Sequence, residues 1–447
     1  MKQYNKVRTV PTKWLEYLPS HWDCKKIGLL FSERKTKVSD KEYAPLSVTK
    51  IGVVSQLESA VKTDAGDNRK LVCKGDFVIN SRSDRKGSCG ISNRDGSVSL
   101  INIVLKPRDE WNRKYVHYMM RCHLFSEEFY HYGRGIVADL WTTRFSEMKN
   151  IFLPIPPRAE QDQIVRFLDW KVSEINKLIK IKRQEIENIV ALKRTLISNT
   201  VIHGLDSNIS MKDSGVKWIG EIPEHWIVVP LCSLAKQKSI CNYDELQLLS
   251  VYLDEGIIPF SQKSEKRTNI TSKDLSKYQR VDPGDFVLNN QQAWRGSVGV
   301  SFYTGIVSPA YIVLKMNDYL DSKYANYLLR SRCMVDQYFV NSKGVGSIQR
   351  NIYWPSLRRS CVPVPPRQEQ EQIVRYLEQQ EVECNKSVTI LNEEIVALAE
   401  LRSTLISNVV TGKIDVRDIV VPDYEYVDEE VDAVEENVPE VNNDEEV

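Results

Sequence analysis

The chain contains one long internal repeat, which limits the folds it can adopt. Residues 154–169 read PIPPRAEQDQIVRFLD and residues 363–378 read PVPPRQEQEQIVRYLE, so eleven of sixteen positions are identical at an offset of 209. The same offset also aligns GDFVIN with GDFVLN (75–80, 284–289), IVLK with IVLK (103–106, 312–315) and TLISN with TLISN (195–199, 404–408). Nearer the start, Trp14 and Trp22 match Trp218 and Trp226 at an offset of 204.

Two copies of about 205 residues are too few and too long for a solenoid, whose units have 20–45 residues. The repeat therefore predicts two equivalent halves related by a pseudo-twofold axis. Such a protein suits a twofold partner, such as duplex DNA or a pair of identical subunits.

Each half is predicted to have a mixed part and a long helix, which places the chain in the α+β class. Short apolar runs between Gly, Asp and Asn turns are typical of strands, and a helix is expected over 113–130 and over 322–339. After Pro157 and Pro366 more than forty residues follow without Pro or Gly, and proline suits the first turn of a helix.

Both long helices carry mostly apolar residues at alternating steps of four and three, the heptad pattern of a coiled coil, although Lys182, Glu381 and the matched pair Lys193 and Arg402 are polar. About 43 residues would make a rod of roughly 64 Å. Two surface helices, each on its own domain, are the alternative, but globular helices usually have about 8–20 residues. We call the positions of this pattern the seam. They are Leu168, Val172, Ile175, Ile179, Lys182, Ile186, Ile189, Lys193 and Leu196, matched by Leu377, Glu381, Cys384, Val388, Leu391, Ile395, Leu398, Arg402 and Leu405.

Charge is unevenly distributed along the chain. The last 25 residues, from Asp423, hold twelve of the 60 acidic residues and no Lys or Arg, so residues 1–422 hold 61 basic and 48 acidic residues, a net charge of +13. We expect the acidic tail at 413–447 to be disordered, and the basic body favours a polyanionic partner.

Composition and motifs narrow the class of protein further. Nine cysteines without a C-x-x-C pair fit a reducing cytoplasm, and neither an apolar run of 18 residues nor a signal peptide is found. The P-loop, dinucleotide, zinc-protease and serine-hydrolase signatures are absent, so we expect no catalytic residue, no metal site and no cofactor in this chain. Recognition is favoured over chemistry.

Three segments together resemble the specificity subunit of type I restriction–modification enzymes. These are MKDSGVKWIGEIPEHW (211–226), GDFVLN (284–289) and VPVPPRQEQEQIVRYLE (362–378). The first copy departs at its start, where KWLEYLPSHW (13–22) replaces the fuller wording. The resemblance covers everything except the acidic tail. It implies two target recognition domains, at 1–156 and 211–365, joined by two long antiparallel coiled-coil helices, at 157–210 (with a linker) and 366–412.

The resemblance also implies a function without catalysis. Each half would read one half of a split sequence in double-stranded DNA, and the helices would set the spacing. Two modification subunits, which bring S-adenosylmethionine to methylate adenine, would dock on the helices, and restriction subunits would add ATP- and magnesium-dependent cleavage. No membrane is involved.

Residues that read DNA should differ between the halves, whereas scaffold residues should match. Two stretches diverge: 81–86 against 290–295, and 132–145 against 341–354. Arginine suits guanine edges and phosphates, and Asn and Gln suit adenine. The candidates are Arg82, Arg85, Lys86, Arg134, Thr142 and Arg144 in the first half, and Asn290, Gln291, Gln292, Trp294, Arg295, Lys343, Gln349 and Arg350 in the second.

Solvated loops with ordinary charges are the alternative for these stretches. For the whole chain, the alternative is a pseudo-dimeric coiled-coil scaffold that binds proteins only. A nuclease with an unrecognised site is disfavoured by the missing motifs. A DNA affinity that falls steeply with salt would separate a DNA reader from a scaffold.

Overall fold

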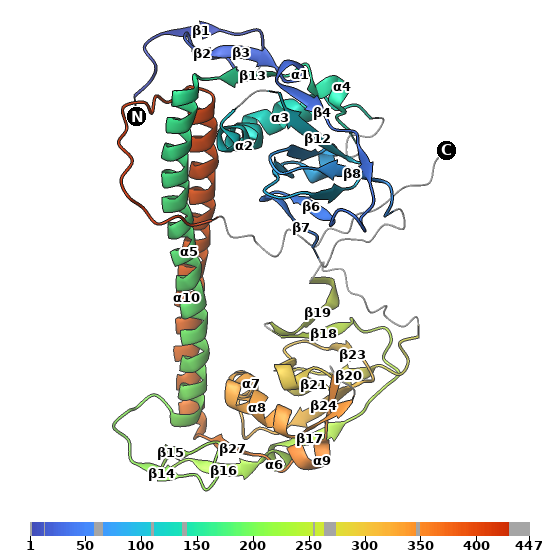
Figure 1. The fold of residues 1–447 in the computed structure, drawn as a ribbon. Helices are drawn as coiled ribbons and strands as arrows, with labels where there is room; N and C mark the ends of the chain where they lie inside the picture. The colour runs from blue at the N-terminus through green and yellow to red at the C-terminus, as the bar shows by residue number, and fades with distance from the viewer. Residues whose placement is uncertain are drawn as a thin grey trace. The chain divides into compact units, whose positions relative to one another are not determined.

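The computed structural model describes residues 2–12, 14–57, 66–108, 111–135, 141–253, 255–262, 274–345 and 349–428. The chain forms two compact units (Figure 1). Unit 1 comprises Met1–Gln184 and Leu391–Val447, and unit 2 comprises Glu185–Ile390. The boundaries fall within the two long helices, so each unit contains one mixed domain and part of both helices.

Unit 1 builds its mixed domain from short strands, four short α-helices and a 3₁₀ turn, followed by the start of the first long helix. The strands are β1 Val7–Thr9, β2 Tyr17–Pro19, β3 Asp23–Lys26, β4 Phe31–Glu33, β5 Lys37–Val38, β6 Leu46–Thr49, β7 Gly52–Ser55, β8 Arg69–Val72, β9 Phe77–Asn80, β10 Cys89–Ile91, β11 Gly96–Val98, β12 Asn102–Pro107 and β13 Phe152–Ile155. The helices are α1 Ile27–Leu30, η1 Ser83–Arg85, α2 Arg113–Arg121, α3 His123–His131, α4 Phe145–Met148 and the long α5 Arg158–His203.

Unit 2 repeats this order after α5. Its strands are β14 Met211–Asp213, β15 Glu221–Pro223, β16 Ile227–Pro230, β17 Ala235–Lys238, β18 Leu249–Tyr252, β19 Gly256–Pro259, β20 Gln279–Val281, β21 Asp285–Asn289, β22 Val298–Val300, β23 Gly305–Val307, β24 Tyr311–Met316, β25 Ser342–Val345, β26 Gln349–Ile352 and β27 Cys361–Val364. Its helices are α6 Leu231–Leu234, η3 Phe260–Gln262, η4 Ala293–Arg295, α7 Ser322–Arg330, α8 Arg332–Val340, α9 Trp354–Leu357 and the long α10 Arg367–Val410.

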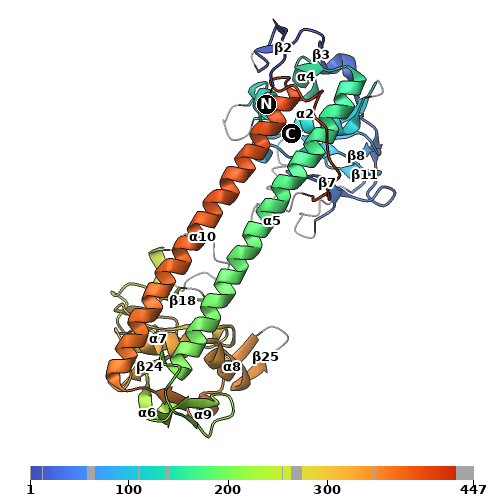
Figure 2. The same cartoon turned by 90° about the vertical axis from the view of Figure 1, so that its left-hand side faces the viewer.

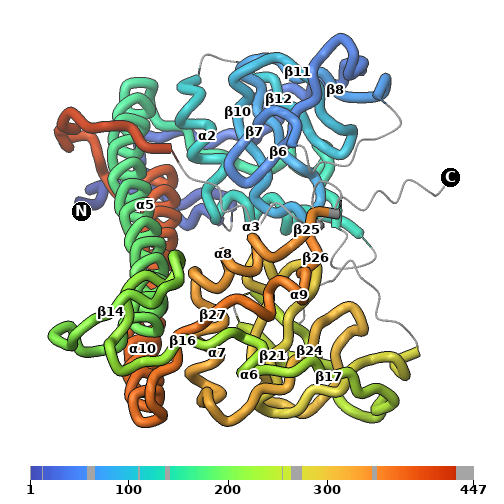
Figure 3. The backbone as a smooth tube through the Cα atoms, turned by 90° about the horizontal axis from the view of Figure 1, so that it is seen from below, coloured from blue at the N-terminus to red at the C-terminus, as the bar shows by residue number. Residues whose placement is uncertain are grey.

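The same four-stranded antiparallel sheet lies at the centre of each unit. Its order is β10-β9-β12-β4 in unit 1 and β22-β21-β24-β17 in unit 2. Phe77 and Ile79 face the helices α2 and α3, whereas Val78 between them packs against the β6–β8 side. Because both faces of the sheet are buried at its centre, the two central strands of each sheet contain continuous apolar runs, as the sequence predicts. Figures 1 and 3 show α7 and α8 between this sheet and the long helices in unit 2.

The repeated Pro-Pro motif fastens the start of each long helix to its mixed domain. The Gln161 amide donates to the Pro156 carbonyl at 2.9 Å and accepts from the Asn112 N–H at 3.1 Å, where α2 begins. Gln370 repeats both bonds, with Pro365 at 2.9 Å and Asp321 at 2.7 Å. The motif occurs twice because each domain needs this junction.

The preceding glutamate of the motif holds the N-terminal strands of its half. Glu160 accepts from His21 at 2.8 Å, and Glu369 accepts from the Trp226 indole N–H at 2.9 Å. Both long helices begin at the first residue after the Pro-Pro pair, as predicted.

The two long helices pack against each other in antiparallel fashion within each unit (Figure 2). Polar seam positions form cross-links: Lys182 pairs with Glu394 at 3.0 Å in unit 1, and Lys193 pairs with Glu381 at 3.0 Å in unit 2. The helix pair is therefore confirmed, and two separate surface helices are excluded.

Each mixed domain also holds the end of the other half's long helix. The Tyr115 hydroxyl donates to the Val410 carbonyl at 3.3 Å in unit 1, and Tyr324 donates to the Val201 carbonyl at 2.9 Å in unit 2. Both tyrosines are fully buried. The core of unit 1 thus includes Val409 and Val410, from the far end of the sequence.

The expectation that the tail is disordered is wrong for residues 413–428, which we name the strap. The strap lies along α5: Gln163 donates to the Val416 and Ile419 carbonyls at 3.0 and 2.7 Å, and Asn176 donates to Val427 at 3.0 Å. Its apolar residues, such as Val416 and Ile419, pack on the unit 1 core and outweigh the acidic composition. Residues 429–447 lie outside the described part. None of the described helices is long and apolar enough to cross a membrane.

Candidate nucleic-acid interface

In unit 1 the structure brings the two divergent stretches together. The Ser83 N–H donates to the Trp141 carbonyl and the Thr143 N–H donates to the Ser81 carbonyl, each at 2.9 Å. Thr142 also exchanges two backbone hydrogen bonds with Arg134, at 3.1 and 3.2 Å. These bonds fix Arg82, Thr142 and Arg134 beside one another, although the stretches are about fifty residues apart in sequence. Residues 136–140 of the second stretch lie outside the described residues.

Beside this junction lies a groove of about 720 Å³, which we name the unit 1 groove. Arg82, Thr142 and Arg144, three of the predicted residues, line it. The other lining residues are Glu33, Lys35, Lys70, Ser81, Leu100, Ile101, Ile103, Phe145, Ser146 and Lys149. Five cations and one carboxylate thus surround a surface on which Leu100 and Ile101 are exposed. The groove offers positive charge together with apolar contact, which suits phosphates and base edges.

Charge in the groove is held in place by the sheet. Glu33 lies 3.4 Å from Lys35 and 3.7 Å from Lys70, and Lys70 also donates to the Asn102 carbonyl at 2.7 Å. Burial lowers the pKa of Lys70, and the neighbouring Lys35 adds to this effect while Glu33 opposes it. An anion bound in the groove would reduce the repulsion between the Lys35 and Lys70 ammonium groups.

Two predicted residues of the first half, Arg85 and Lys86, do not line the groove. Arg85 ends the 3₁₀ turn η1, and its carbonyl accepts from the Tyr130 hydroxyl at 3.2 Å. The Lys86 ammonium forms an ion pair with Glu127 on α3. Arg134 also lies outside the lining of the groove.

In unit 2 the two divergent stretches meet as well. The Ile352 N–H donates to the side-chain oxygen of Asn290 at 2.9 Å, which ties the first stretch to the β25–β26 hairpin. Within this hairpin, Arg350 donates to the Ser342 hydroxyl at 2.8 Å and lies over the Phe339 ring at 4.3 Å. Part of the hydrogen-bonding capacity of Asn290 and Arg350 is therefore used within unit 2 itself.

Exposed groups of the second half remain near this hairpin. Lys343 is exposed over the Tyr353 ring at 4.1 Å, and Gln291 is exposed. Trp294 is half-buried, with its indole N–H donating to the Gln291 carbonyl at 3.0 Å, and Gln292 is half-buried. The side chain of Gln349 and residues 346–348 lie outside what the structure describes.

Arg295 lies elsewhere than the sequence suggested. Its exposed guanidinium lies 4.7 Å from the centre of the Trp294 ring, and it lines a second hollow, of about 1000 Å³. We name this hollow the helix cleft, because α5, α10 and α7 form most of its wall, with Lys193, Arg194, Lys323 and Arg330 among its lining.

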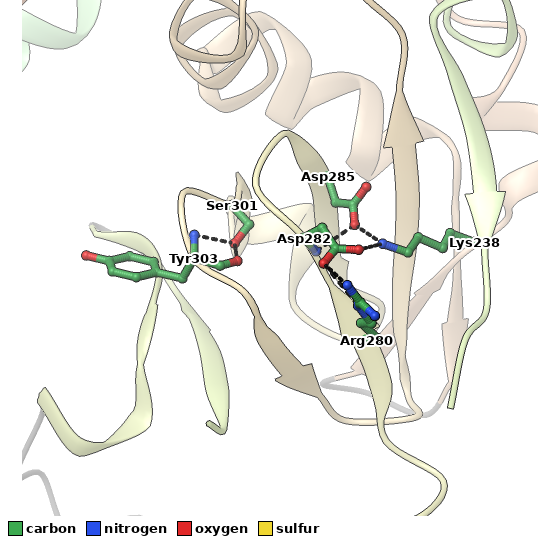
Figure 4. A network of polar contacts seen from close by, with 6 residues as sticks. All are labelled: Lys238, Arg280, Asp282, Asp285, Ser301 and Tyr303. Carbon is green, nitrogen blue, oxygen red and sulfur yellow. Dashed lines mark hydrogen bonds and ion pairs between the residues drawn. The ribbon is translucent and has the colours of Figure 1, made fainter. Parts of the chain in front are cut away.

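The recurrent Gly-Asp-Phe turns support both surfaces and do not form a site. Asp76 accepts two bonds from Arg34, at 2.7 and 3.1 Å, and its counterpart Asp285 forms an ion pair with Lys238. In unit 2 this network is larger, because Lys238 also reaches Asp282 at 2.7 Å and Arg280 donates to Asp282 at 2.9 Å (Figure 4). These ion pairs fix the strands that carry the divergent loops.

Sequence reasoning missed Lys35, Lys70 and Lys149. They lie outside the two stretches, although they also differ between the halves: Lys70, for example, aligns with Gln279. Comparing every aligned position for a change of charge would have identified Lys70. Among the described residues, no group of three His, Cys, Asp or Glu side chains is placed to hold a metal ion.

Comparison with known proteins shows which proteins this chain resembles. Residues 19–188 match the family model of the type I restriction modification DNA specificity domain. The chain is 22% identical to the putative type I restriction enzyme MjaX specificity subunit of Methanocaldococcus jannaschii, over 86% of this chain and 87% of that relative. The MjaVIII specificity subunit of the same organism is 24% identical over 61% of this chain and 64% of the relative. The chain is thus similar to type I restriction–modification specificity subunits over most of its length.

A solved structure shows the same fold. A chain from a study of complex assembly and conformational transition of the type I R-M system is 14% identical, with a TM-score of 0.60 over 90% of this chain and 100% of that one. The family match covers unit 1 from β2 into α5. Because unit 2 repeats the central sheet of unit 1, the chain contains two domains of one architecture.

Proposed function

We propose that this chain is the specificity subunit, the sequence-specific DNA-recognition component, of a type I restriction–modification complex, and that each unit reads one half of a bipartite target. One observation carries the proposal: the divergent stretches meet on the same place of two equivalent scaffolds, whereas the residues that build the scaffolds match. Two readers on one frame suit a target with two different halves.

The residues divide by role. In unit 1, Arg82, Thr142 and Arg144, together with Lys35, Lys70 and Lys149, would contact phosphates and base edges. In unit 2, Gln291, Lys343 and Arg350 would do so beside the hairpin. Arginine pairs with guanine through two bonds and glutamine with adenine, so the halves would prefer different bases.

The helix pair would carry the partner subunits. The two long helices begin with the same motif and repeat their surfaces, so two copies of one modification subunit could dock. S-adenosylmethionine would then be bound by the modification subunits, and ATP and magnesium by restriction subunits. This chain would supply recognition and spacing without catalysis, in the cytoplasm where the DNA lies.

Methylation mapping tests the proposal. The chain would be expressed with the modification subunit of its own host, in a strain without such systems, and the DNA sequenced for modified adenine. We expect a two-part motif with a fixed gap. A complex that assembles and leaves the DNA unmodified would contradict the proposal and favour a scaffold that binds proteins only.

A salt titration distinguishes these two functions directly. A DNA reader that neutralises five phosphates should lose affinity with a slope of about −4.5 in log K against log salt, since each contact contributes about −0.9. A protein-only scaffold would show weak DNA binding without this slope.

A further inference from the structure

The strap marks a peptide-binding strip on unit 1. The Val427 N–H donates to the Ser173 hydroxyl at 3.1 Å, and the Val427 carbonyl accepts from Asn176 at 3.0 Å. These two bonds clamp the backbone of an extended chain. Ser173 and Asn176 are only 2% and 6% exposed.

Side chains of the strap add charge and aromatic contacts. Lys114 on α2 lies 5.3 Å from the centre of the Tyr426 ring, and Lys177 lies 3.5 Å from the Glu425 carboxylate. Residues 422–428 read PDYEYVD, an extended segment that combines carboxylates with tyrosines. The strip therefore recognises a backbone together with acidic and aromatic side chains.

Unit 2 presents the equivalent strip, and among the described residues it is exposed. An offset of 209 converts Lys114, Ser173, Asn176 and Lys177 into Lys323, Val382, Asn385 and Lys386. Val382 is 68% exposed, and Asn385 is exposed. We name Lys323, Val382, Asn385 and Lys386 the open strip. The serine acceptor is lost at Val382, whereas the two lysines and the asparagine are kept.

The surroundings of the open strip match those of the occupied one. Asn176 accepts from Arg402 at 2.6 Å in unit 1, and Asn385 accepts from Lys193 at 3.4 Å in unit 2, so the amide group of each is left to face a peptide carbonyl. Asn385 and Lys323 also line the helix cleft, whose cations include Arg330 and Arg332. Six cations line this cleft against two carboxylates, Glu378 and Glu381, and Lys323 pairs with Glu378 at 2.6 Å. The remaining excess of positive charge suits an acidic segment.

We propose that the open strip binds an extended acidic, tyrosine-containing peptide segment of a partner protein, in the manner in which unit 1 binds its own strap. The occupant seen at the equivalent place is a peptide and not a nucleic acid, and the charge of the open strip complements that peptide. This surface is independent of DNA recognition, so either proposal can fail without the other.

The test uses the full-length chain and a fluorescent synthetic peptide with the sequence of residues 419–428. We expect one peptide to bind per chain, because the strap covers the strip on unit 1. Lys323→Glu should weaken this binding about tenfold, since it reverses the charge beside the tyrosine. A peptide with Asp and Glu replaced by Asn and Gln should bind more weakly as well.

The repeat supplies a matched control. Lys114→Glu, the equivalent change in unit 1, should leave peptide binding to the full-length chain unchanged. Truncation after Val421, which removes the clamped residues and keeps the core residues Val410 and Val416, should add a second binding site. Lys114→Glu in the truncated chain should remove that second site only.

Three outcomes would overturn the proposal. The first is no peptide binding to the folded full-length chain. The second is displacement of the peptide by duplex DNA at equal ionic strength, lost in Lys323→Glu, which would assign the strip to nucleic acid. The third is a dimer of the full-length chain that truncation abolishes, which would make a second copy the occupant.

Discussion

Lys70 in unit 1 and Gln279 in unit 2 occupy the same position and make the same hydrogen bond. The Lys70 ammonium donates to the Asn102 carbonyl at 2.7 Å, and the Gln279 amide donates to the Tyr311 carbonyl, the equivalent group, also at 2.7 Å. One side chain carries a charge and the other does not. The duplicated scaffold thus keeps its geometry while the charge near the divergent loops changes. Two mixed domains of the same architecture can therefore present different DNA-contacting residues.

Matched substitutions in the sheet should have the largest effect and should affect both halves equally. Phe77→Ala and Phe286→Ala each remove a fully buried ring at equivalent positions of β9 and β21. We expect each to lower the free energy of unfolding by about 3–5 kcal/mol. Denaturant unfolding of both variants measures this. If the losses in free energy of unfolding differ by more than about 2 kcal/mol between the two variants, the two mixed domains are not energetically equivalent.

A substitution in one divergent loop should instead affect only one half-site. Arg82→Ala removes a cation from the unit 1 groove, so we expect a loss of about 1–3 kcal/mol in binding to the cognate target and relaxed methylation at one position of one half-site. Methylation mapping of the variant shows which half relaxes. Lys86→Ala is the control, because Lys86 pairs with Glu127 outside the groove and should leave the motif intact.

Replacing Lys70 by its unit 2 counterpart sharpens the comparison further. Lys70→Gln keeps a donor for the Asn102 carbonyl and removes one charge, so stability should hardly change. The slope of log K against log salt should become shallower by about 0.9, the effect of one phosphate contact. An unchanged slope, measured by fluorescence anisotropy, would remove Lys70 from the DNA-binding residues.

The smallest effect is expected from pH, in unit 2 alone. Burial opposes ionisation of Asp282, yet hydrogen bonds from Lys238 and Arg280 lower the pKa of this carboxyl. The stabilisation is therefore complete above the ordinary aspartate pKa of about 3.9 and is lost as the pH falls through the lower folded value. Asp282→Asn should reduce the acid sensitivity of unfolding below the ordinary aspartate pKa of about 3.9. If the variant and the unsubstituted protein unfold with the same pH profile, the network does not contribute to the pH dependence of stability.

Much of this fold follows from the sequence, because its repeat compares the chain with itself. The helix starts after Pro157 and Pro366 and the apolar runs of β9 and β21 are confirmed. The meeting of the divergent stretches is a finding of the structure that the sequence comparison did not predict. The order of the strap was not predicted because its composition is acidic. Val416 and Ile419 pack against a core surface that exists only once unit 1 has folded. The direction of Arg295 could not be predicted, since one loop residue can face either the hairpin or the helix cleft.

The fastening of Tyr115 to Val410 has a consequence for the order in which the protein folds during synthesis. Unit 2 ends at Ile390, so all of its residues leave the ribosome before the last 57, Leu391–Val447, which belong to unit 1. At about 5–20 residues per second this delay is about 3–11 s. Until then the core of unit 1 lacks Leu405, Val409, Val410 and Val416. The half that is translated first is completed last, and a nascent chain keeps that apolar surface exposed until translation ends.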